Sequence, residues 1–378
     1  MKRVSLKLTT LVILLGGAIS TINAQTNPIN VVTSAVPFLR ITPDARSGGM
    51  GDAGIATSPD ANSNFSNLAK TPFNTSKFGV ALNYVPWLRD LAVNDVYLAS
   101  LAGFYKIDDQ SAITASLRYF SLGSIEFTDF SGTYLSTYRP REFAVDLGYS
   151  RKLSAKNSLG LAVRFINSSL AKGDYNGESY KAASAVAADL HFYHHGAKEN
   201  GQGFNWGATL SNLGSKISYT GKADQKDYIP ANLGIGAAYT KVFDEDNKIT
   251  FAADIHKLLV PTPGDTTAGA LQKYRSQGVV SSWVKSFGDA PDGISEEIQE
   301  INVALGLEYW YNNQFAFRAG YFYENPAKGN RKFFSVGAGL KYNVFGLNFA
   351  YLFPSGSGTT RNPLSNTYRF GLIFDFAK

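Results

Sequence analysis

Cysteine is absent from this chain of 378 residues, and methionine (2) and histidine (4) are scarce. Without cysteine there is no disulfide framework and no thiol that could carry a lipid anchor. Long apolar runs are also rare: beyond the first 24 residues, no segment provides the roughly 20 consecutive apolar residues that a membrane-spanning helix needs. These absences exclude a disulfide-stapled secreted protein and a helical membrane protein.

The first 24 residues have the pattern of a secretory signal. Lys2, Arg3 and Lys7 form a basic start, residues 8–19 are an apolar run too short for a membrane anchor, and Ala24 closes a cleavage site. We therefore expect residues 1–24 to be a signal peptide. Without its three lysine and arginine residues, the formal charge of +6 falls to +3, with 33 basic against 30 acidic residues. A balance this small does not indicate a nucleic-acid partner.

What the chain has in abundance is aromatic residues (13%) and a strict two-residue alternation. In residues 158–166, Leu159, Leu161, Val163 and Phe165 fall on one face of an extended strand, and small or polar residues fall on the other. A soluble sheet turns such an apolar face inward, whereas a barrel in lipid turns it outward. A mean hydropathy of −0.13 excludes neither arrangement, because half of each barrel strand is polar.

The connections between the strands favour the barrel. Short turns, such as residues 154–157 and 312–313, alternate with longer links, such as 121–141, 211–231 and 260–300. Short turns at one end and long loops at the other are typical of outer-membrane barrels, which have an even number of strands. We therefore predict an all-β fold, a transmembrane antiparallel β-barrel of about 14 strands over residues 75–378. The predicted strands are residues 77–85, 96–106, 112–120, 142–153, 158–168, 182–193, 204–210, 233–242, 249–258, 301–311, 314–323, 333–343, 345–352 and 368–377.

Residues 25–74 do not alternate, and we expect them to form a plug or hatch inside the barrel. Gly49, Gly51 and Gly54 match the spacing G-x-G-x-x-G of a dinucleotide-binding loop. That motif requires a buried strand before it and a helix after it, and the sequence predicts neither. The glycines instead indicate tight turns and close backbone contact.

Several polar plug residues are expected to point into the lumen, where buried charges need partners. They are Arg40, Asp44, Arg46, Asp52, Asp60 and Asn67. The predicted partners are charged residues in the middle of the strands, on the faces opposite the apolar ones. These are Asp146, Arg164, Asp254, Arg318 and Arg369.

The long links carry aromatic and apolar residues that we predict to contact a partner. These residues are Trp87, Leu88, Phe127, Phe130, Tyr134, Tyr219 and Trp283. The link 260–300 is too long for a plain loop, and we expect a short helix over residues 268–286. Its acidic run, Glu296, Glu297 and Glu300, lacks calcium-loop spacing and is expected to be solvated.

No catalytic pattern is present in the sequence. The four histidines are accompanied by no cysteine or carboxylate cluster that would complete a metal site, and no G-x-S-x-G elbow occurs. An outer-membrane lipid-modifying enzyme is the weakest hypothesis, and we expect neither a cofactor nor a metal.

The stretch from Ala35 to Asn62, with Pro37-Phe38-Leu39-Arg40 and Gly48-Gly49-Met50-Gly51-Asp52, resembles the opening of the PorV family of outer-membrane shuttle proteins. These proteins serve the type IX secretion system of Bacteroidota, and the similarity extends to the ending 368–378. The family lies within the FadL-like barrel group. In that group an Asn-Pro-Ala triplet follows the plug glycines, whereas this chain has Asn67-Leu68-Ala69.

The resemblance implies a non-enzymatic carrier in the outer membrane of a Gram-negative, Bacteroidota-like cell. Its partners would be the large translocon barrel (SprA, also called Sov), cargo proteins with C-terminal secretion domains, a PorU-like attachment complex and outer-membrane lipid. The carrier would dock on the translocon, accept cargo through its C-terminal domain and shuttle it to the cell surface. The alternative is a FadL-type channel for hydrophobic small molecules, with an apolar pocket behind the plug.

Overall fold

The structure is a computed structural model that describes residues 31–87, 95–128, 131–175, 178–220, 222, 225–262, 268–354 and 366–376. The predicted signal peptide and two of the predicted contact residues, Leu88 and Phe130, lie outside these ranges. None of the helices in the described ranges is long and apolar enough to cross a membrane.

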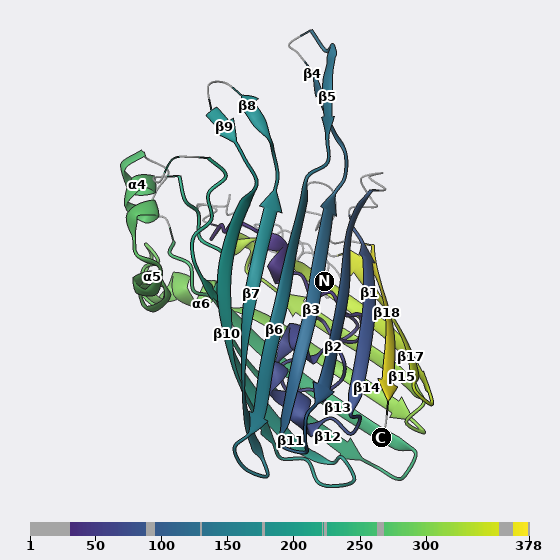
Figure 1. Cartoon of the computed structure of the whole chain (residues 1–378). Coiled ribbons are helices and arrows are strands. Elements are labelled where there is room, and N and C mark those ends of the chain that lie inside the picture. Colours follow the sequence, from purple (N-terminus) through teal and green to yellow (C-terminus); the bar gives the residue numbers. More distant parts are fainter. Residues whose placement is uncertain are drawn as a thin grey trace, which may run out of the picture.

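Within the described residues, 14 antiparallel strands form one closed barrel (Figure 1). The barrel closes where β1 pairs with β18, with Phe78 opposite Phe376. The predicted all-β barrel is therefore confirmed. Its strands are β1 (Phe78–Pro86), β2 (Val96–Lys106), β3 (Ser111–Leu122), β6 (Arg141–Lys152), β7 (Asn157–Ser169), β10 (Ala183–His195), β11 (Gly203–Gly214), β12 (Asn232–Val242), β13 (Asn247–Leu258), β14 (Asn302–Tyr311), β15 (Phe315–Tyr323), β16 (Lys332–Tyr342), β17 (Phe345–Pro354) and β18 (Thr367–Phe376).

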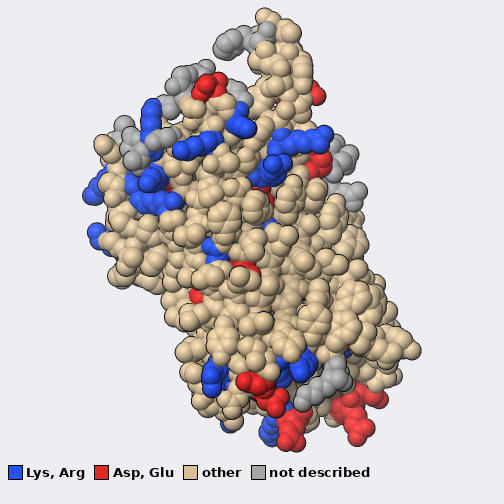
Figure 2. Space-filling view, viewed as in Figure 1, with Lys and Arg blue, Asp and Glu red and all other residues tan. Residues whose placement is uncertain are grey.

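The wall is apolar outside and polar inside, which is the inverse of a soluble sheet. On β7, Leu161 and Val163 are 60% and 63% exposed, whereas the next residue, Arg164, points to the other face and is 4% exposed. Charged side chains on the face shown in Figure 2 gather toward the two ends of the molecule, and the zone between them carries few. This pattern is that of a barrel whose middle lies in lipid.

The two ends of the barrel differ (Figure 1). Turns such as 107–110 and 343–344 are short and lie at the end that also holds the C-terminus. The opposite end carries the hairpin β4 (Ile125–Thr128)–β5 (Tyr134–Tyr138), the hairpin β8 (Gly173–Tyr175)–β9 (Glu178–Tyr180) and an insertion between β13 and β14. Because long loops of such barrels face outward from the cell, we refer to this end as extracellular.

The described part of the insertion, residues 259–262 and 268–301, contains three helices, α4 (Ala268–Ser276), α5 (Val279–Lys285) and α6 (Ile294–Gln299). The single helix predicted over 268–286 is divided at Gln277 and Gly278. The expectation that Glu296, Glu297 and Glu300 are solvated is wrong, because all three are buried. Two lysines that are distant in sequence neutralise them, which no local pattern signals.

The N-terminal segment, residues 32–76, lies inside the barrel, where Figure 1 shows it in purple. Its short turns are η1 (Pro37–Arg40), α2 (Ala45–Gly48), α3 (Ser63–Ser66) and η2 (Leu68–Phe73). α2 lies against β16, β17 and β18, and η2 lies against β6, β7 and β10 on the other side. The segment therefore crosses the lumen between opposite walls.

Glycines allow the segment to press against the wall. Gly51 has a φ of +66°, and a Cβ there would lie 2.5 Å from the Tyr321 nitrogen and 2.8 Å from the Leu305 carbonyl oxygen. The wall is bare at the same place, since Gly306 and Gly320 are register partners on β14 and β15. Both faces lack side chains where they meet, which accounts for the glycine-rich pattern.

We predict that Gly51→Ala destabilises the barrel more than Gly132→Ala does. Both glycines have positive φ (+66° and +79°), but nothing lies within 4 Å of a Cβ at Gly132. Both variants share the strain of a positive φ. The difference between their losses of stability therefore measures the steric collision of the new Cβ at position 51 with the wall, and overpacking of this kind costs about 1–3 kcal/mol. The midpoint of thermal unfolding, followed in detergent by heat-modifiable gel migration, measures it. Equal midpoints would show that the segment does not press on β14 and β15.

Candidate functional site

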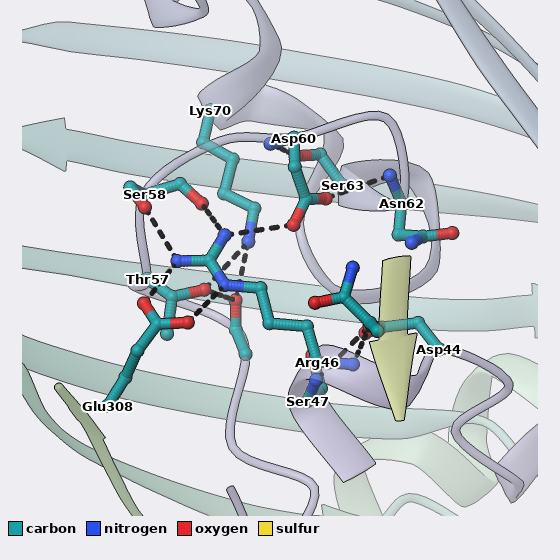
Figure 3. A network of polar contacts seen from close by, with 12 residues as sticks. Asp44, Arg46, Ser47, Thr57, Ser58, Asp60, Asn62, Ser63, Lys70 and Glu308 are labelled. Carbon is teal, nitrogen blue, oxygen red and sulfur yellow. Dashed lines mark hydrogen bonds and ion pairs between the residues drawn. The ribbon is translucent and has the colours of Figure 1, made fainter. Parts of the chain in front are cut away.

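Arg46 is the centre of the polar network inside the barrel (Figure 3). Its guanidinium donates through Nε and Nη2 to the two carboxylate oxygens of Glu308 on β14, at 2.9 and 2.7 Å. Nη1 donates to Asp60 Oδ2 at 2.9 Å, and Nη2 also donates to Ser58 Oγ at 2.7 Å. The fork geometry of arginine suits this bidentate pairing, so the network ties the segment to the wall in one orientation.

Acidic residues of the segment stabilise its own turns. Asp44 is the N-cap of α2, where its Oδ1 accepts from the backbone nitrogens of Arg46 at 2.7 Å and Ser47 at 3.1 Å. Asp60 accepts from the Asn62 nitrogen at 2.8 Å in the same way. Short polar side chains before a turn favour this capping. Asp44 therefore acts within the segment, and among the described residues it forms no ion pair with the wall.

The backbone of the segment is bound to the wall as well. Asp254 Oδ2 on β13 accepts from the nitrogens of Gly54 and Ile55, at 2.6 and 2.9 Å. Asn67 donates from Nδ2 to the Phe192 carbonyl at 2.9 Å and to the Ile55 carbonyl at 3.2 Å. His191 Nδ1 accepts from the Leu68 nitrogen at 2.8 Å. These bonds satisfy backbone groups that would otherwise be buried without partners.

Two further ion pairs join the segment to the wall. Asp52 pairs with Arg369 on β18. Arg40 pairs at 3.2 Å with Glu324, which follows β15 and also binds Arg331 at 2.7 Å. Burial opposes the charge of Glu324, but Arg331 and Arg40 hold its pKa below the usual range. This carboxylate stays ionised between its two arginines at neutral pH.

Not every predicted lumen charge meets the segment. Arg164 pairs instead with Asp146 and Asp189 on the neighbouring strands β6 and β10, and with Asn212. Arg318 pairs with Glu308 at 2.7 Å, so it reaches Arg46 only through the shared carboxylate. Alternation predicts which residues face inward but not which wall residue lies opposite.

Glu308 and Glu324 were missed by the sequence reasoning. Glu308 sits on the polar face of the predicted strand 301–311, two residues from Gly306. A lone carboxylate on a lumen face is a signal that could have identified it. Glu324 lies in a link, where no periodicity indicates burial.

A cavity of about 630 Å³ lies above the segment in the lumen. Phe38, Trp87, Phe120 and Phe333 contribute apolar surface, and Arg118 contributes a charged group. The size is within the range of small-molecule sites. Further charged side chains, such as Arg40 and Arg331, also border it, so the lining combines apolar surface with charged groups and suits an amphiphilic molecule.

The predicted contact residues divide between the two sides of the extracellular rim. Tyr134 on β5 is exposed, Phe127 on β4 is partly exposed, and Trp283 on α5 is partly buried. Trp87 packs on Phe120 with ring centroids 5.3 Å apart, so it lines the cavity. Tyr219 is hydrogen-bonded to Ser168 Oγ at 2.9 Å and packs on a buried apolar cluster. Trp87 and Tyr219 are therefore half-buried and contact interior residues, and their contact with a partner stays a prediction.

In the part of the chain that the structure describes, no group of three or more His, Cys, Asp or Glu residues could hold a metal ion. Most of the charges described above are bound to other charges or to backbone groups of the interior. Chemically, the interior offers binding and rigid support, and the extracellular hairpins offer surface.

Both the sequence and the fold of this chain are similar to those of known proteins. The family model described as "Type IX secretion system protein PorV" matches residues 23–265. No curated relative matches the sequence.

Among the solved structures with a similar fold, the following three have TM-scores of 0.52. A TodX deltaS2S3 mutant, titled a monoaromatic hydrocarbon channel, is 16% identical, with 87% of this chain and 97% of that chain covered. The Ralstonia pickettii toluene transporter TbuX is 10% identical, and the P. putida toluene transporter TodX is 13% identical, each with 88% of this chain and 98% of that chain covered. At these identities the likeness shows the barrel fold alone.

We predict that Arg46→Glu strongly destabilises the barrel, because it places a carboxylate against Glu308 and Asp60. Breaking a buried pair costs about 3–5 kcal/mol, so the thermal midpoint in detergent should fall well below that of the parent protein. Lys156→Glu, in an exposed turn, is the matched charge reversal and should have little effect. If Arg46→Glu does not fold, Arg46→Met supplies the same comparison. An unchanged midpoint for both Arg46 variants would show that the pairing does not hold the segment.

Proposed function

The chain belongs to the PorV family of the type IX secretion system, and from this premise we propose that it is a carrier that binds secreted proteins at the cell surface. The barrel is an outer-membrane component of that system. In the proposal it docks on the translocon barrel, accepts cargo through the C-terminal secretion domain and delivers it to the attachment complex. The protein acts by recognition and not by catalysis.

The barrel interior supports this proposal, because the segment 32–76 crosses the lumen from wall to wall and is bound there on several sides. Arg46, Asp52 and Arg40 bind three different parts of the wall, and Asp254 binds the backbone. A folded polypeptide has no path through a lumen that is closed in this way. Cargo must therefore be bound outside, on the extracellular surface.

The observation that carries the proposal is the β4–β5 hairpin. It projects beyond the rim, farther than any other described element in Figure 1. Leu135 and Tyr134 are 61% and 58% exposed, and Ile125 on the facing strand is also exposed. Exposed aromatic and aliphatic side chains on a projecting hairpin are typical of a protein contact, since such residues dominate binding energy once they are covered. The outer strand edges can also pair with an extended segment of a partner.

The lumen cavity favours a second function, a channel for hydrophobic small molecules. Its lining includes aromatic side chains that fit an apolar ligand, and the cited structures of similar fold are titled toluene transporters or a monoaromatic hydrocarbon channel. We rank this function second, because the same buried pairs that hold the segment also close the route below the cavity.

Purification of the protein from its native outer membrane in mild detergent, followed by mass spectrometry, separates the two functions. Recovery of a very large barrel protein, or of secreted proteins that share one C-terminal domain, supports the carrier. Recovery of the barrel alone with a bound fatty acid or another apolar small molecule supports the channel.

We predict that Tyr134→Asp with Leu135→Asp abolishes this recovery of partners. Two charges on the hairpin remove apolar contact area, and loss of central interface residues costs about 2 kcal/mol or more each, so recovery should fall at least tenfold. Leu153→Asp is the control, because Leu153 is equally exposed (62%) in a turn at the opposite end. Undiminished recovery with the double variant would exclude the hairpin as the contact.

A further inference from the structure

Helices α5 and α6 expose an unusually large apolar face. On α5 and just after it, Val280, Val284 and Phe287 follow the i, i+4, i+7 spacing and are 67%, 72% and 53% exposed. On α6, Ile294 and Ile298 are 80% and 63% exposed at i, i+4. We refer to these five large exposed apolar side chains together as the apolar face of α5–α6. So many exposed apolar side chains on two neighbouring short helices indicate a surface that is covered in the working protein.

The anchoring of α6 shows where this face lies. Lys257 is on β13 in the same alternation as Phe251 and Ile255, both exposed, so Lys257 belongs to the lipid-facing side of the strand. Its Nζ donates to Glu297 Oε2 at 2.8 Å and to Glu300 Oε2 at 2.6 Å. α6 therefore lies on the outside of the wall. Lys257 is two residues beyond Ile255, about 7 Å along the strand.

A second lysine fixes the orientation of α6. Lys328, which follows β15, donates to Glu296 Oε1 at 2.5 Å and to Glu300 Oε1 at 3.0 Å. Thr262 Oγ1 also donates to Glu300 Oε1, at 2.8 Å. These groups are buried against the wall, so every acidic side chain of α6 turns inward. The side of the helix that faces away from the barrel therefore carries Ile294 and Ile298, with the small Ser295 between them.

The surroundings of the apolar face are themselves lipid-facing. Below it, Ile255 on β13 and Leu305 on β14 are 44% and 46% exposed on the outer wall. Figure 1 shows α5 and α6 beside the upper part of the wall and not above the mouth of the barrel. The apolar face thus continues the lipid-contacting surface upward, toward the level of the headgroups.

We propose that α5–α6 is an interfacial membrane contact, whose apolar face is inserted in the outer leaflet next to the barrel. Amphipathic helices that lie in the membrane plane bury their apolar side some 5–10 Å deep, at the boundary of headgroups and acyl chains. The ion pairs of Lys257 and Lys328 with the three glutamates at α6 hold this helix at that level. The insertion between β13 and β14 is then a lateral contact with lipid, distinct from the β4–β5 hairpin.

The absence of native cysteine allows a direct test. Single cysteines at Val284 and Ile298 are labelled with an environment-sensitive fluorophore, and the purified protein is placed in phosphatidylcholine vesicles with and without nitroxide-bearing lipid. Ile255→Cys on the outer wall is the reference for lipid contact. Leu135→Cys on the projecting hairpin is the reference for water, and Lys285→Cys tests the other side of α5. Heat-modifiable migration verifies that each labelled barrel is folded.

We expect nitroxide lipid to quench the labels at Val284 and Ile298 at least about threefold more than the label at Leu135, close to Ile255, because both lie at acyl-chain level. The label at Lys285 should be quenched less than its neighbour at Val284. The proposal is overturned if both helix labels behave like Leu135 in vesicles. It is also overturned if they become shielded only when another membrane protein is present, since the face would then be a protein interface.

Discussion

Lipid provides no hydrogen-bond partner for an unpaired strand, so a sheet inside the bilayer must close on itself. The pairing of β1 with β18 meets this constraint, and most of the remaining structure depends on it. Closure gives each strand one face toward lipid and one toward an enclosed space. The alternation of residues 158–166 is the local consequence, with Leu161 and Val163 outside and Arg164 inside.

The enclosed space creates a second requirement, because polar side chains in a narrow lumen lose water and need partners. The N-terminal segment supplies them. Arg46 donates to both carboxylate oxygens of Glu308, and two backbone nitrogens of the segment donate to Asp254. Buried ion pairs add little net stability, because desolvation offsets their attraction, but they penalise any misplaced arrangement. Their main effect is therefore to fix one position of the segment. The closed lumen that results is the reason for placing recognition at the extracellular loops.

The strands could be predicted from sequence because each carries a local signal, a two-residue period between turn residues. All fourteen predicted strands correspond to strands of the barrel, and the largest difference is at β11, which extends to Gly214 and not to residue 210. The small hairpins β4–β5 and β8–β9 were not predicted, since they are short and carry no buried face.

Pairing across the lumen could not be predicted, because it joins residues that are far apart in sequence. Asp52 with Arg369 and Arg46 with Glu308 depend on the shape of the closed barrel. The burial of Glu296, Glu297 and Glu300 has the same origin, since Lys257 comes from strand β13 and Lys328 from the link after β15. The half-burial of Trp87 and Tyr219 against interior residues also depends on how the links fold at the rim, which no local pattern indicates.

Lys257 also defines the level of the membrane. A lysine on the lipid-facing side of a barrel costs about 2–4 kcal/mol at the bilayer midplane and about 0–1 kcal/mol near the interface. Its position near the upper end of β13, neutralised by Glu297 and Glu300, is consistent with the interface and not with the midplane. The apolar face of α5–α6 then lies at the lipid boundary, whereas the β4–β5 hairpin stands above it in water. In the proposed arrangement, contact with lipid and contact with proteins fall on separate elements, so recognition of partners would require no change in the position of the protein in the membrane.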